Sequence, residues 1–462
     1  MTDIETNGYD GFEESGEDTI TVNNVKIHDK IIIGAGAAGL MAAYSACQIG
    51  SDSGYNPDIV VLESGEMPGR KITATGNGKC NLTNTNQTQE CYRSSDPAKA
   101  FRIINRFDYK KTLELFKTFG VLHSERNGYC YPYGEQARTL RDVLVSKVES
   151  MGAQIKTSKK VCGIEKTEGT FIVSCEDGSV YKSKKLIVTT GGAAAPVFGS
   201  DGSLFFLLKE IGLNIKPLMP ALCGLTSNYK YLRRIDGVRL RCNCKLYSGK
   251  YSNILYSERG EIVFNKKGLS GIPIMNLSRF AIEELYTSVK KRFGNNSQRT
   301  NFYAERKVMN NKVGVILDFF PDIDLKELKE YMCSVVMASV VPIGTALSAL
   351  INDKLLKACM ADLELDYDEK TIAYDSKTIT SELGKLAEIL KGLDIHITGD
   401  VGFENAQTTQ GGVILKEIDE KSMESYKYPG MFFAGEVLDV DGMCGGYNLQ
   451  WAWTTGYIAG RN

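Results

Sequence analysis

The hydrophobic and polar positions near the start of the chain predict a strand, a helix and a second strand in succession. The apolar run Ile31–Ile33 is typical of a short buried strand. An alanine-rich run at 40–47 favours a helix, and the apolar run at 58–62 favours another buried strand. The pattern therefore predicts a β-α-β unit over residues 26–64.

Glycines at the turn between this strand and helix indicate a dinucleotide site. Gly34, Gly36 and Gly39 have the G-x-G-x-x-G spacing, which permits a tight turn, backbone approach to a pyrophosphate and close helix–strand packing. The helix N-terminus adds unpaired N–H groups and a positive dipole end. Glu63 ends the second strand 24 residues after Gly39, as a carboxylate suited to a ribose hydroxyl, and the turn composition of 51–57 accounts for the extra length.

The remaining pattern divides the chain into a nucleotide-binding domain made of both chain ends and an inserted region. Helical periodicity is expected at 97–120, 135–151, 322–391 and from Tyr447 onward, strands at 154–190, 215–320 and 431–434, and an aromatic-rich loop at 129–134. The boundaries that we predict are a tail at 1–25, the first part of the nucleotide domain at 26–198, a β-rich insert at 199–321, a helical insert at 322–394 and the second part of the nucleotide domain at 395–462.

Composition narrows the function classes. The chain has 462 residues with 43% hydrophobic and 24% charged residues, and its net charge of −1 gives no electrostatic argument for a nucleic-acid partner. Residues 1–25 hold seven acids and no Lys or Arg, which predicts a disordered acidic tail rather than a secretory signal. No apolar run is long enough for a membrane span, and twelve cysteines without a signal peptide favour reduced thiols in the cytoplasm.

Nucleotide-like signals at both ends of the chain favour FAD over NAD. Arg70 and Lys71 follow Glu63 closely, where cations can approach phosphate or adenosine oxygens, and Gly191 ends a strand where backbone can approach a ligand. Near the C-terminus, GEVLDVDG supplies carboxylates for ribityl hydroxyls. CGGYNLQWAWTTG then opens a helix whose N-terminus can stabilise a reduced flavin. A nicotinamide cofactor, NAD(P)H, would dock transiently, because the sequence has no second G-x-G-x-x-G.

The motifs IIIGAGAAGL, GRKITATGNGKCNLTN, ENAQTTQGGVILKEID and FFAGEVLDVDGMCGGYNLQWAWTTG together resemble a family of NAD(P)/FAD-dependent oxidoreductases. That family includes 3-dehydro-bile-acid reductases and aminoacetone-oxidase-like flavoproteins. The resemblance covers residues 28–462 and implies an α/β fold class, with a Rossmann-type FAD-binding domain that carries an inserted β-barrel-like and helical region. The stretch TTGGAAAPVFGSDG departs from the family where substrate would enter, which leaves the substrate class open.

The resemblance also implies positions for the cofactor contacts. It places the adenosine and pyrophosphate on Gly34, Gly36, Ala38, Gly39, Glu63, Arg70 and Lys71, with a backbone contact to the adenine from Val161. It places the flavin on Gly76, Asn77, Glu436, Asn448 and Leu449.

The sequence indicates the catalytic residues less clearly than the cofactor contacts, because a flavin itself carries hydride chemistry. Tyr447 in the flavin-side loop is the first candidate for a proton donor. Cys80 and Cys444 lie in loops expected to face the flavin, as a redox pair or a reactive thiol, or as small buried residues. No metal site is predicted, because Cys242 and Cys244 lack further ligands nearby in sequence.

Three functions remain open at this point, and a fourth, a flavoprotein that acts on nucleic acid, is disfavoured by the near-zero net charge. The first is NAD(P)H-driven reduction of an activated C=C in a hydrophobic, steroid-like or bile-acid-like enone. The second is an FAD-dependent oxidase of a small amine or ketone, and the third is a flavin-binding protein without turnover. A small-molecule substrate is expected in the first two. The oligomeric state is not predicted.

Overall fold

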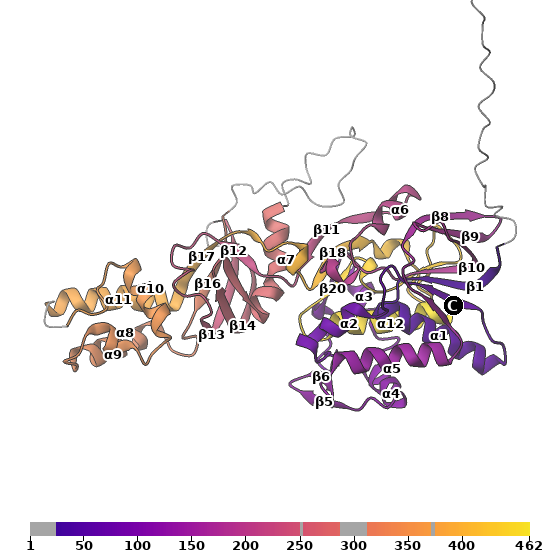
Figure 1. The fold of residues 1–462 in the computed structure, drawn as a ribbon. Helices are drawn as coiled ribbons and strands as arrows, with labels where there is room; N and C mark the ends of the chain where they lie inside the picture. Colours follow the sequence, from indigo (N-terminus) through magenta and orange to yellow (C-terminus); the bar gives the residue numbers. More distant parts are fainter. Residues whose placement is uncertain (1–24, 250–252, 287–311, 371–374) are drawn as a thin grey trace, which may run out of the picture.

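The computed structural model describes residues 25–249, 253–286, 312–370 and 375–462, which form three parts in a row (Figure 1). The nucleotide-binding part holds both ends of the described chain. A closed β-barrel follows it, and a group of helices lies beyond the barrel. Residues 1–24 of the predicted tail lie outside the described residues.

The central sheet of the nucleotide-binding part joins the beginning and the end of the chain. Ile31 is paired in parallel with Val60 on one side and Leu186 on the other, and all three side chains are buried. A late strand is also parallel to the one that contains Leu186. The strands are β7 (Gln154–Lys156), β2 (Ile59–Leu62), β1 (Ile27–Ile33), β10 (Val180–Val188) and β19 (Met431–Phe433), with β9 (Thr170–Cys175) and β8 (Val161–Thr167) added antiparallel. The predicted Rossmann-type α/β fold made of both chain ends is confirmed.

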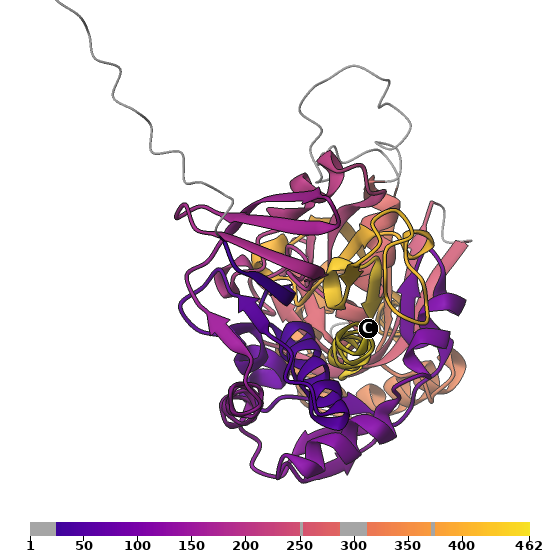
Figure 2. The same ribbon diagram turned by 90° about the vertical axis from the view of Figure 1, so that its right-hand side faces the viewer.

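The first and last helices of this part pack directly on each other. Helix α1 (Ala37–Ser53) and helix α12 (Tyr447–Arg461) lie side by side, as the view along the C-terminal helix shows (Figure 2). A Cβ on Gly456 would lie 2.4 Å from the carbonyl oxygen of Ala38, and one on Gly460 would lie 2.2 Å from that of Ala42. Only glycine allows this approach, so α12 is fixed against the helix that follows the glycine turn.

Shorter elements surround these helices. At two places they differ from the prediction. The segment 97–120 is two helices rather than one, because Asp108 caps a second helix with its side chain. Tyr129–Pro132, predicted as a loop, is a strand. The elements are α2 (Arg70–Ala74), β3 (Thr83–Asn84), β4 (Tyr92–Ser94), α3 (Pro97–Ile104), α4 (Tyr109–Thr118), β5 (His123–Arg126), β6 (Tyr129–Pro132), α5 (Ala137–Ser150), α6 (Leu204–Glu210), β11 (Ile215–Ala221), β18 (Thr408–Val413) and β20 (Val440–Gly442).

The inserted region consists of a six-stranded closed barrel and a helical group. The barrel strands, in order, are β12 (Leu225–Ser227), β15 (Gly268–Gly271), β14 (Asn253–Asn265), β13 (Arg239–Ser248), β16 (Val313–Asp318) and β17 (Leu393–Asp400). The helical group is α8 (Leu325–Met337), α9 (Ile343–Leu347), α10 (Asp353–Asp362) and α11 (Ser376–Gly392). No helix within the described ranges has the length and apolar character needed to cross a membrane.

Helix α7 (Ile272–Tyr286) was not predicted, because its residues were expected to form strands. It packs on barrel strand β14 and on β11, so it lies where the barrel meets the nucleotide-binding part (Figure 1).

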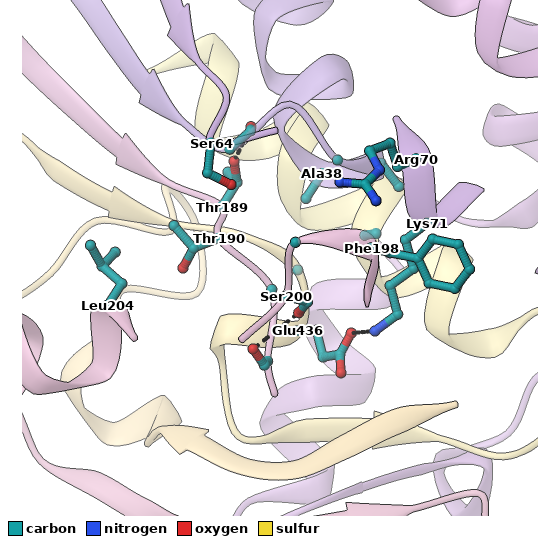
Figure 3. Close-up of a pocket in the computed structure, with 18 of the residues that line it drawn as sticks. Ala38, Ser64, Arg70, Lys71, Thr189, Thr190, Phe198, Ser200, Leu204 and Glu436 are labelled. Carbon is teal, nitrogen blue, oxygen red and sulfur yellow. Dashed lines mark hydrogen bonds and ion pairs between the residues drawn. The ribbon is translucent and has the colours of Figure 1, made fainter. Parts of the chain in front are cut away.

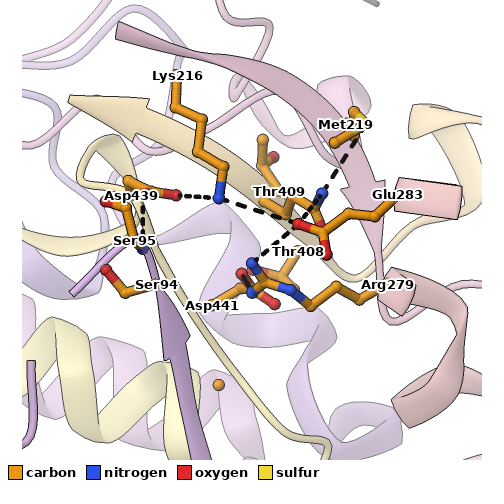
Figure 4. Close-up of polar contacts among 12 residues, drawn as sticks. Ser94, Ser95, Lys216, Met219, Arg279, Glu283, Thr408, Thr409, Asp439 and Asp441 are labelled. Atoms are coloured by element: carbon orange, nitrogen blue, oxygen red, sulfur yellow. Dashed lines mark hydrogen bonds and ion pairs between the residues drawn. The ribbon is translucent and has the colours of Figure 1, made fainter. Parts of the chain in front are cut away.

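A buried network of charged side chains joins the two parts through this helix (Figure 4). Arg279 of α7 forms an ion pair with Asp441 of β20, and both side chains are buried. Lys216 Nζ lies 3.3 Å from Asp439 Oδ1 and 4.0 Å from Glu283 Oε1. The carboxylates on the nucleotide side are thus balanced by cations from α7 and β11.

We expect Arg279→Ala to lower the free energy of unfolding by about 3–5 kcal/mol, because it leaves the buried carboxylate of Asp441 without its cation. Arg259→Ala is the matched control, since Arg259 pairs with Asp322 on the surface, and it should cost about 0–1 kcal/mol. Urea unfolding followed by circular dichroism compares the two variants. Equal losses would contradict a structural role for the buried pair.

Candidate functional site

A cavity in the nucleotide-binding part lies against the glycine turn, and Figure 3 shows side chains that line it. Its empty volume is about 1410 Å³, including space open to solvent. Eleven of the fourteen predicted cofactor residues line it: Gly34, Gly36, Ala38, Glu63, Arg70, Lys71, Val161, Gly191, Glu436, Asn448 and Leu449. The cavity therefore gathers residues that are spread over most of the chain.

The glycine turn has the geometry needed for a phosphate group. Gly34 has a φ of +98°, and its Cβ would lie 2.7 Å from the carbonyl oxygen of Thr189. A Cβ on Gly36 would meet nothing within 4 Å, so this backbone faces open space where a ligand can approach. Gly39 does not line the cavity. Its Cβ would lie 1.9 Å from the carbonyl oxygen of Gly34, so it serves close packing between helix and turn.

Glu63 defines one end of the cavity. Its carboxylate accepts hydrogen bonds from the backbone N–H groups of Ala35 and Gly65, both at 2.8 Å. These bonds hold the carboxylate at the glycine turn, and each oxygen keeps lone-pair capacity for a hydroxyl donor. Val161 lines the cavity together with Lys159 and Lys160, two cations that the sequence analysis did not identify.

In the middle of the cavity, Arg70 and Lys71 contact other parts of the chain (Figure 3). Arg70 Nη2 donates to the carbonyl oxygen of Val197 at 2.5 Å. Lys71 Nζ lies 2.8 Å from Glu436 Oε2, and the other oxygen of Glu436 accepts from the N–H of Thr409. Lys71, assigned by resemblance to the adenosine and pyrophosphate, thus pairs with a carboxylate assigned to the flavin.

The start of α12 forms the opposite end. Asn448 and Leu449 of its first turn line the cavity. The Asn448 side chain accepts from the N–H of Gly442 at 2.8 Å and donates to the carbonyl oxygen of the same residue at 3.0 Å. This helix N-terminus presents a positive dipole end to the cavity.

Gly76 and Asn77 do not line the cavity, and their flavin contacts stay a prediction. Both have left-handed backbone, with φ values of 55° and 54°. Their neighbour Thr75 does line it. Gln407 and Thr408 also line the cavity and were not predicted, although both lie in the motif ENAQTTQGGVILKEID.

Tyr447 is buried, and its hydroxyl donates to the carbonyl oxygen of Asn86 at 2.8 Å. Burial raises the pKa of this hydroxyl well above its ordinary value, with Cys91 acting in the same direction. This geometry does not favour Tyr447 as the proton donor.

Cys80 and Cys444 are protonated thiols at neutral pH. Burial raises the pKa of Cys80 to about 12 and that of Cys444 to about 11. A reactive thiol needs a lowered pKa, so these surroundings favour the interpretation of both as small packing residues.

The described residues contain no cluster of His, Cys, Asp and Glu that could hold a metal ion. Cys242 and Cys244 are buried in the barrel with their sulfur atoms 3.5 Å apart.

The sequence model of the HI0933-like protein Rossmann domain family matches residues 28–462. The chain belongs to this family. It is 32% identical over 433 residues to the 3-dehydro-bile acid delta(4,6)-reductase of Clostridium scindens, covering 93% of this chain and 97% of that protein.

Two other relatives are named ribosomal RNA dihydrouridine synthase. The protein from Haemophilus influenzae is 27% identical over 435 residues, covering 93% of this chain and 96% of the relative. The protein from Escherichia coli is 24% identical over 434 residues, covering 94% and 97%. The likeness to all three spans nearly the whole chain, inserts included.

Substitutions at two glycines distinguish a role in FAD binding from a role in packing the helix against the turn. We expect Gly36→Ala to fold normally, because its methyl group meets only open space, but to weaken FAD binding about tenfold or more, which corresponds to about 1.4 kcal/mol. Gly39→Ala should instead destabilise the fold by about 1–3 kcal/mol through overpacking. Flavin titration and thermal unfolding of each apoprotein measure the two effects. A Gly36→Ala protein with unchanged FAD affinity would contradict the assignment of this turn.

The raised pKa values also predict thiol reactivity. At neutral pH we expect iodoacetamide to alkylate the exposed Cys162 before Cys80 or Cys444, because alkylation requires the thiolate. Cys444 should become reactive only as the pH approaches 11. Peptide mass spectrometry after timed alkylation gives the order, and early modification of Cys444 would revive the redox interpretation.

Proposed function

We propose that this chain is an FAD-dependent oxidoreductase that uses NAD(P)H to reduce a C=C bond conjugated to a carbonyl in a hydrophobic, steroid-like enone. The observation that carries the proposal is the continuous cavity from Glu63 to Asn448, with the glycine turn along its wall. The relative named as a bile acid reductase matches over both the nucleotide-binding part and the insert.

The residues present fit FAD at three points. The carboxylate of Glu63 can accept a ribose hydroxyl, and the open backbone at Gly36 can contact the pyrophosphate at the start of α1. At the other end, Asn448 and Leu449 would lie beside the isoalloxazine. The positive end of α12 there favours negative charge on a reduced ring. FAD, when bound, would supply the hydride chemistry.

The chain itself would then orient the substrate, exclude water and deliver a proton. Helix α7 lies next to the cavity, because Gln407 lines the cavity and its Nε2 lies 3.6 Å from the sulfur of Met275. We place the substrate there, between the insert and the nucleotide-binding part. NAD(P)H would occupy the same space before the substrate binds.

A second candidate is reduction of uridine in ribosomal RNA, favoured by the two relatives named for that activity. Dihydrouridine differs from uridine by two hydrogens on a C=C bond conjugated to a carbonyl, so the same chemistry would serve. The sequence-based expectation of no nucleic-acid partner therefore stays a prediction. The net charge of −1 favours a small molecule, since RNA binding relies on cationic surface.

The test is an anaerobic experiment on the purified holoprotein. We expect NADH or NADPH to bleach the flavin absorbance, and a 3-oxo-4,6-diene steroid acid to restore it. The matched control is the same steroid with both C=C bonds saturated, which should restore nothing. Recovery only with a ribosomal RNA fragment would favour the second candidate, and recovery only with oxygen would favour an oxidase or a protein without a reductase role.

A further inference from the structure

Glu258 of strand β14 places a carboxyl group where the barrel meets the nucleotide-binding part. The side chain is half-buried. Its Oε1 accepts a hydrogen bond from Asn276 Nδ2 at 2.9 Å, and its Oε2 accepts one from the hydroxyl of Tyr256 at 3.1 Å. In the part of the chain that the structure describes, no Lys, Arg or His forms an ion pair with it. Within the described ranges it is therefore a carboxyl group held by hydrogen bonds and not by an ion pair.

Hydrogen bonds connect this carboxyl group to the cavity end at α12. Asn276 of α7 donates to Glu258 and accepts from the backbone N–H of Cys444 at 2.8 Å. Cys444 lies four positions before Asn448, which lines the cavity. Met275, next to Asn276, contacts the cavity residue Gln407. These contacts of two neighbouring α7 residues place Glu258 one side chain, that of Asn276, away from the loop that leads into α12. Glu258 itself is not among the residues that line the cavity.

The titratable groups around Glu258 come from five elements. They are Arg93 of β4, Tyr129 of β6, Cys244 of β13, Tyr256 of β14, and Cys444 and Tyr447 at the start of α12. Burial raises the pKa of Glu258 above its ordinary value, and the hydrogen bonds from Asn276 and Tyr256 and the charge of Arg93 oppose that rise. The protonated form is therefore favoured more than for an exposed glutamate.

Arg93 packs against two aromatic rings near Glu258. Its side chain is 8% exposed, and its guanidinium lies 5.5 Å from the ring centre of Tyr256 and 5.1 Å from that of Phe280. The cation thus stacks on the rings and does not form a salt bridge with the carboxyl group. The contact of Arg93 with Glu258 is therefore electrostatic at a distance and not a hydrogen-bonded ion pair.

Reduction of a conjugated C=C bond needs a proton as well as a hydride. Hydride addition to the carbon farther from the carbonyl leaves an enolate, and the carbon next to the carbonyl must then gain a proton. The hydroxyl of Tyr447 already donates to the carbonyl oxygen of Asn86, so another acid is required.

We propose that Glu258 is the general acid that protonates the carbon next to the substrate carbonyl, with Asn276 and Tyr256 as positioning residues; this inference rests on the proposed function. The O–H bond of Glu258 breaks as the new C–H bond forms, and the electron pair comes from the enolate. The carboxylate that remains is reprotonated by water, to which its half-exposed position gives access. The hydride and its two electrons come ultimately from NAD(P)H.

The first experiment compares Glu258→Gln with Glu261→Gln. Glu261 lies on the same strand, is exposed and forms a surface ion pair with exposed Arg239 at 3.7 Å. We expect both holoenzymes to keep the rate of flavin reduction by NAD(P)H. Reoxidation by the 3-oxo-4,6-diene steroid acid should fall about 10²- to 10⁴-fold in Glu258→Gln alone. Glu258→Asp should recover part of the rate, and the alkaline fall of the wild-type rate should be absent from Glu258→Gln.

A second readout does not require turnover. Infrared difference spectra of the holoenzyme, between oxidised and dithionite-reduced flavin, should contain a deuterium-sensitive carboxylic acid C=O band. The band should be present in wild type and in Glu261→Gln and absent from Glu258→Gln. An unchanged reoxidation rate, or a band that survives in Glu258→Gln, would overturn the assignment. A wild-type enzyme whose reduced flavin the steroid cannot reoxidise would contradict the proposed function, while the infrared band would still decide whether Glu258 is a protonated neighbour of the flavin.

Discussion

Contact between backbones at glycine positions is the constraint on which the rest of this structure depends. The carbonyl oxygen of Gly34 lies where a Cβ of Gly39 would be, and that of Ala38 lies close to where a Cβ of Gly456 would be. β1, α1 and α12 can approach this closely only because these positions lack side chains. The same approach places the N-termini of both helices on one cavity. The geometry of the site therefore follows from the packing of the two chain ends.

The inserted region depends on a second constraint, the alternation of side chains over residues 439–441, where β20 begins. Val440 lines the cavity, whereas Asp439 and Asp441 on either side of it form ion pairs with Lys216 and Arg279. Neighbouring residues of a strand point to opposite faces, so one short segment contacts the cofactor space and holds the insert. A buried carboxylate requires a cation with good geometry, which restricts how α7 can sit against the nucleotide-binding part.

The sequence predicted those features that depend on local pattern. The strand, glycine turn and helix at residues 31–47 follow from apolar runs and glycine spacing, and Glu63 follows from its place at the end of a strand. Features that depend on distant partners were missed. Tyr129–Pro132 is a strand because β3 and β5 pair with it. Helix α7 begins with an apolar run and a proline. Without knowledge of its partners, this local sequence indicates the end of a strand, although proline is also tolerated in the first turn of a helix.

In the candidate site, too, local sequence predicts some features, and contacts between distant residues determine the others. Lys71 was assigned to phosphate or adenosine oxygens because it follows Glu63 in sequence. In the structure it contacts Glu436, which lies 365 residues later in the chain. Nothing in the alternating pattern of strand β14 distinguishes Glu258 from the exposed acid Glu261. Their difference arises only when α7 brings Asn276 between β14 and Cys444.

Access to water separates Glu258 from the other acids near the cavity. A general acid loses its proton in every turnover and must regain it. Asp441 is fully buried and paired with Arg279, so it has no contact with solvent from which to regain a proton. Cys80 is equally buried, and its pKa of about 12 makes it a poor donor at neutral pH. A carboxyl group that is partly desolvated, fixed by two hydrogen bonds and still reachable by water meets both needs, and the half-buried edge of the barrel supplies such a position.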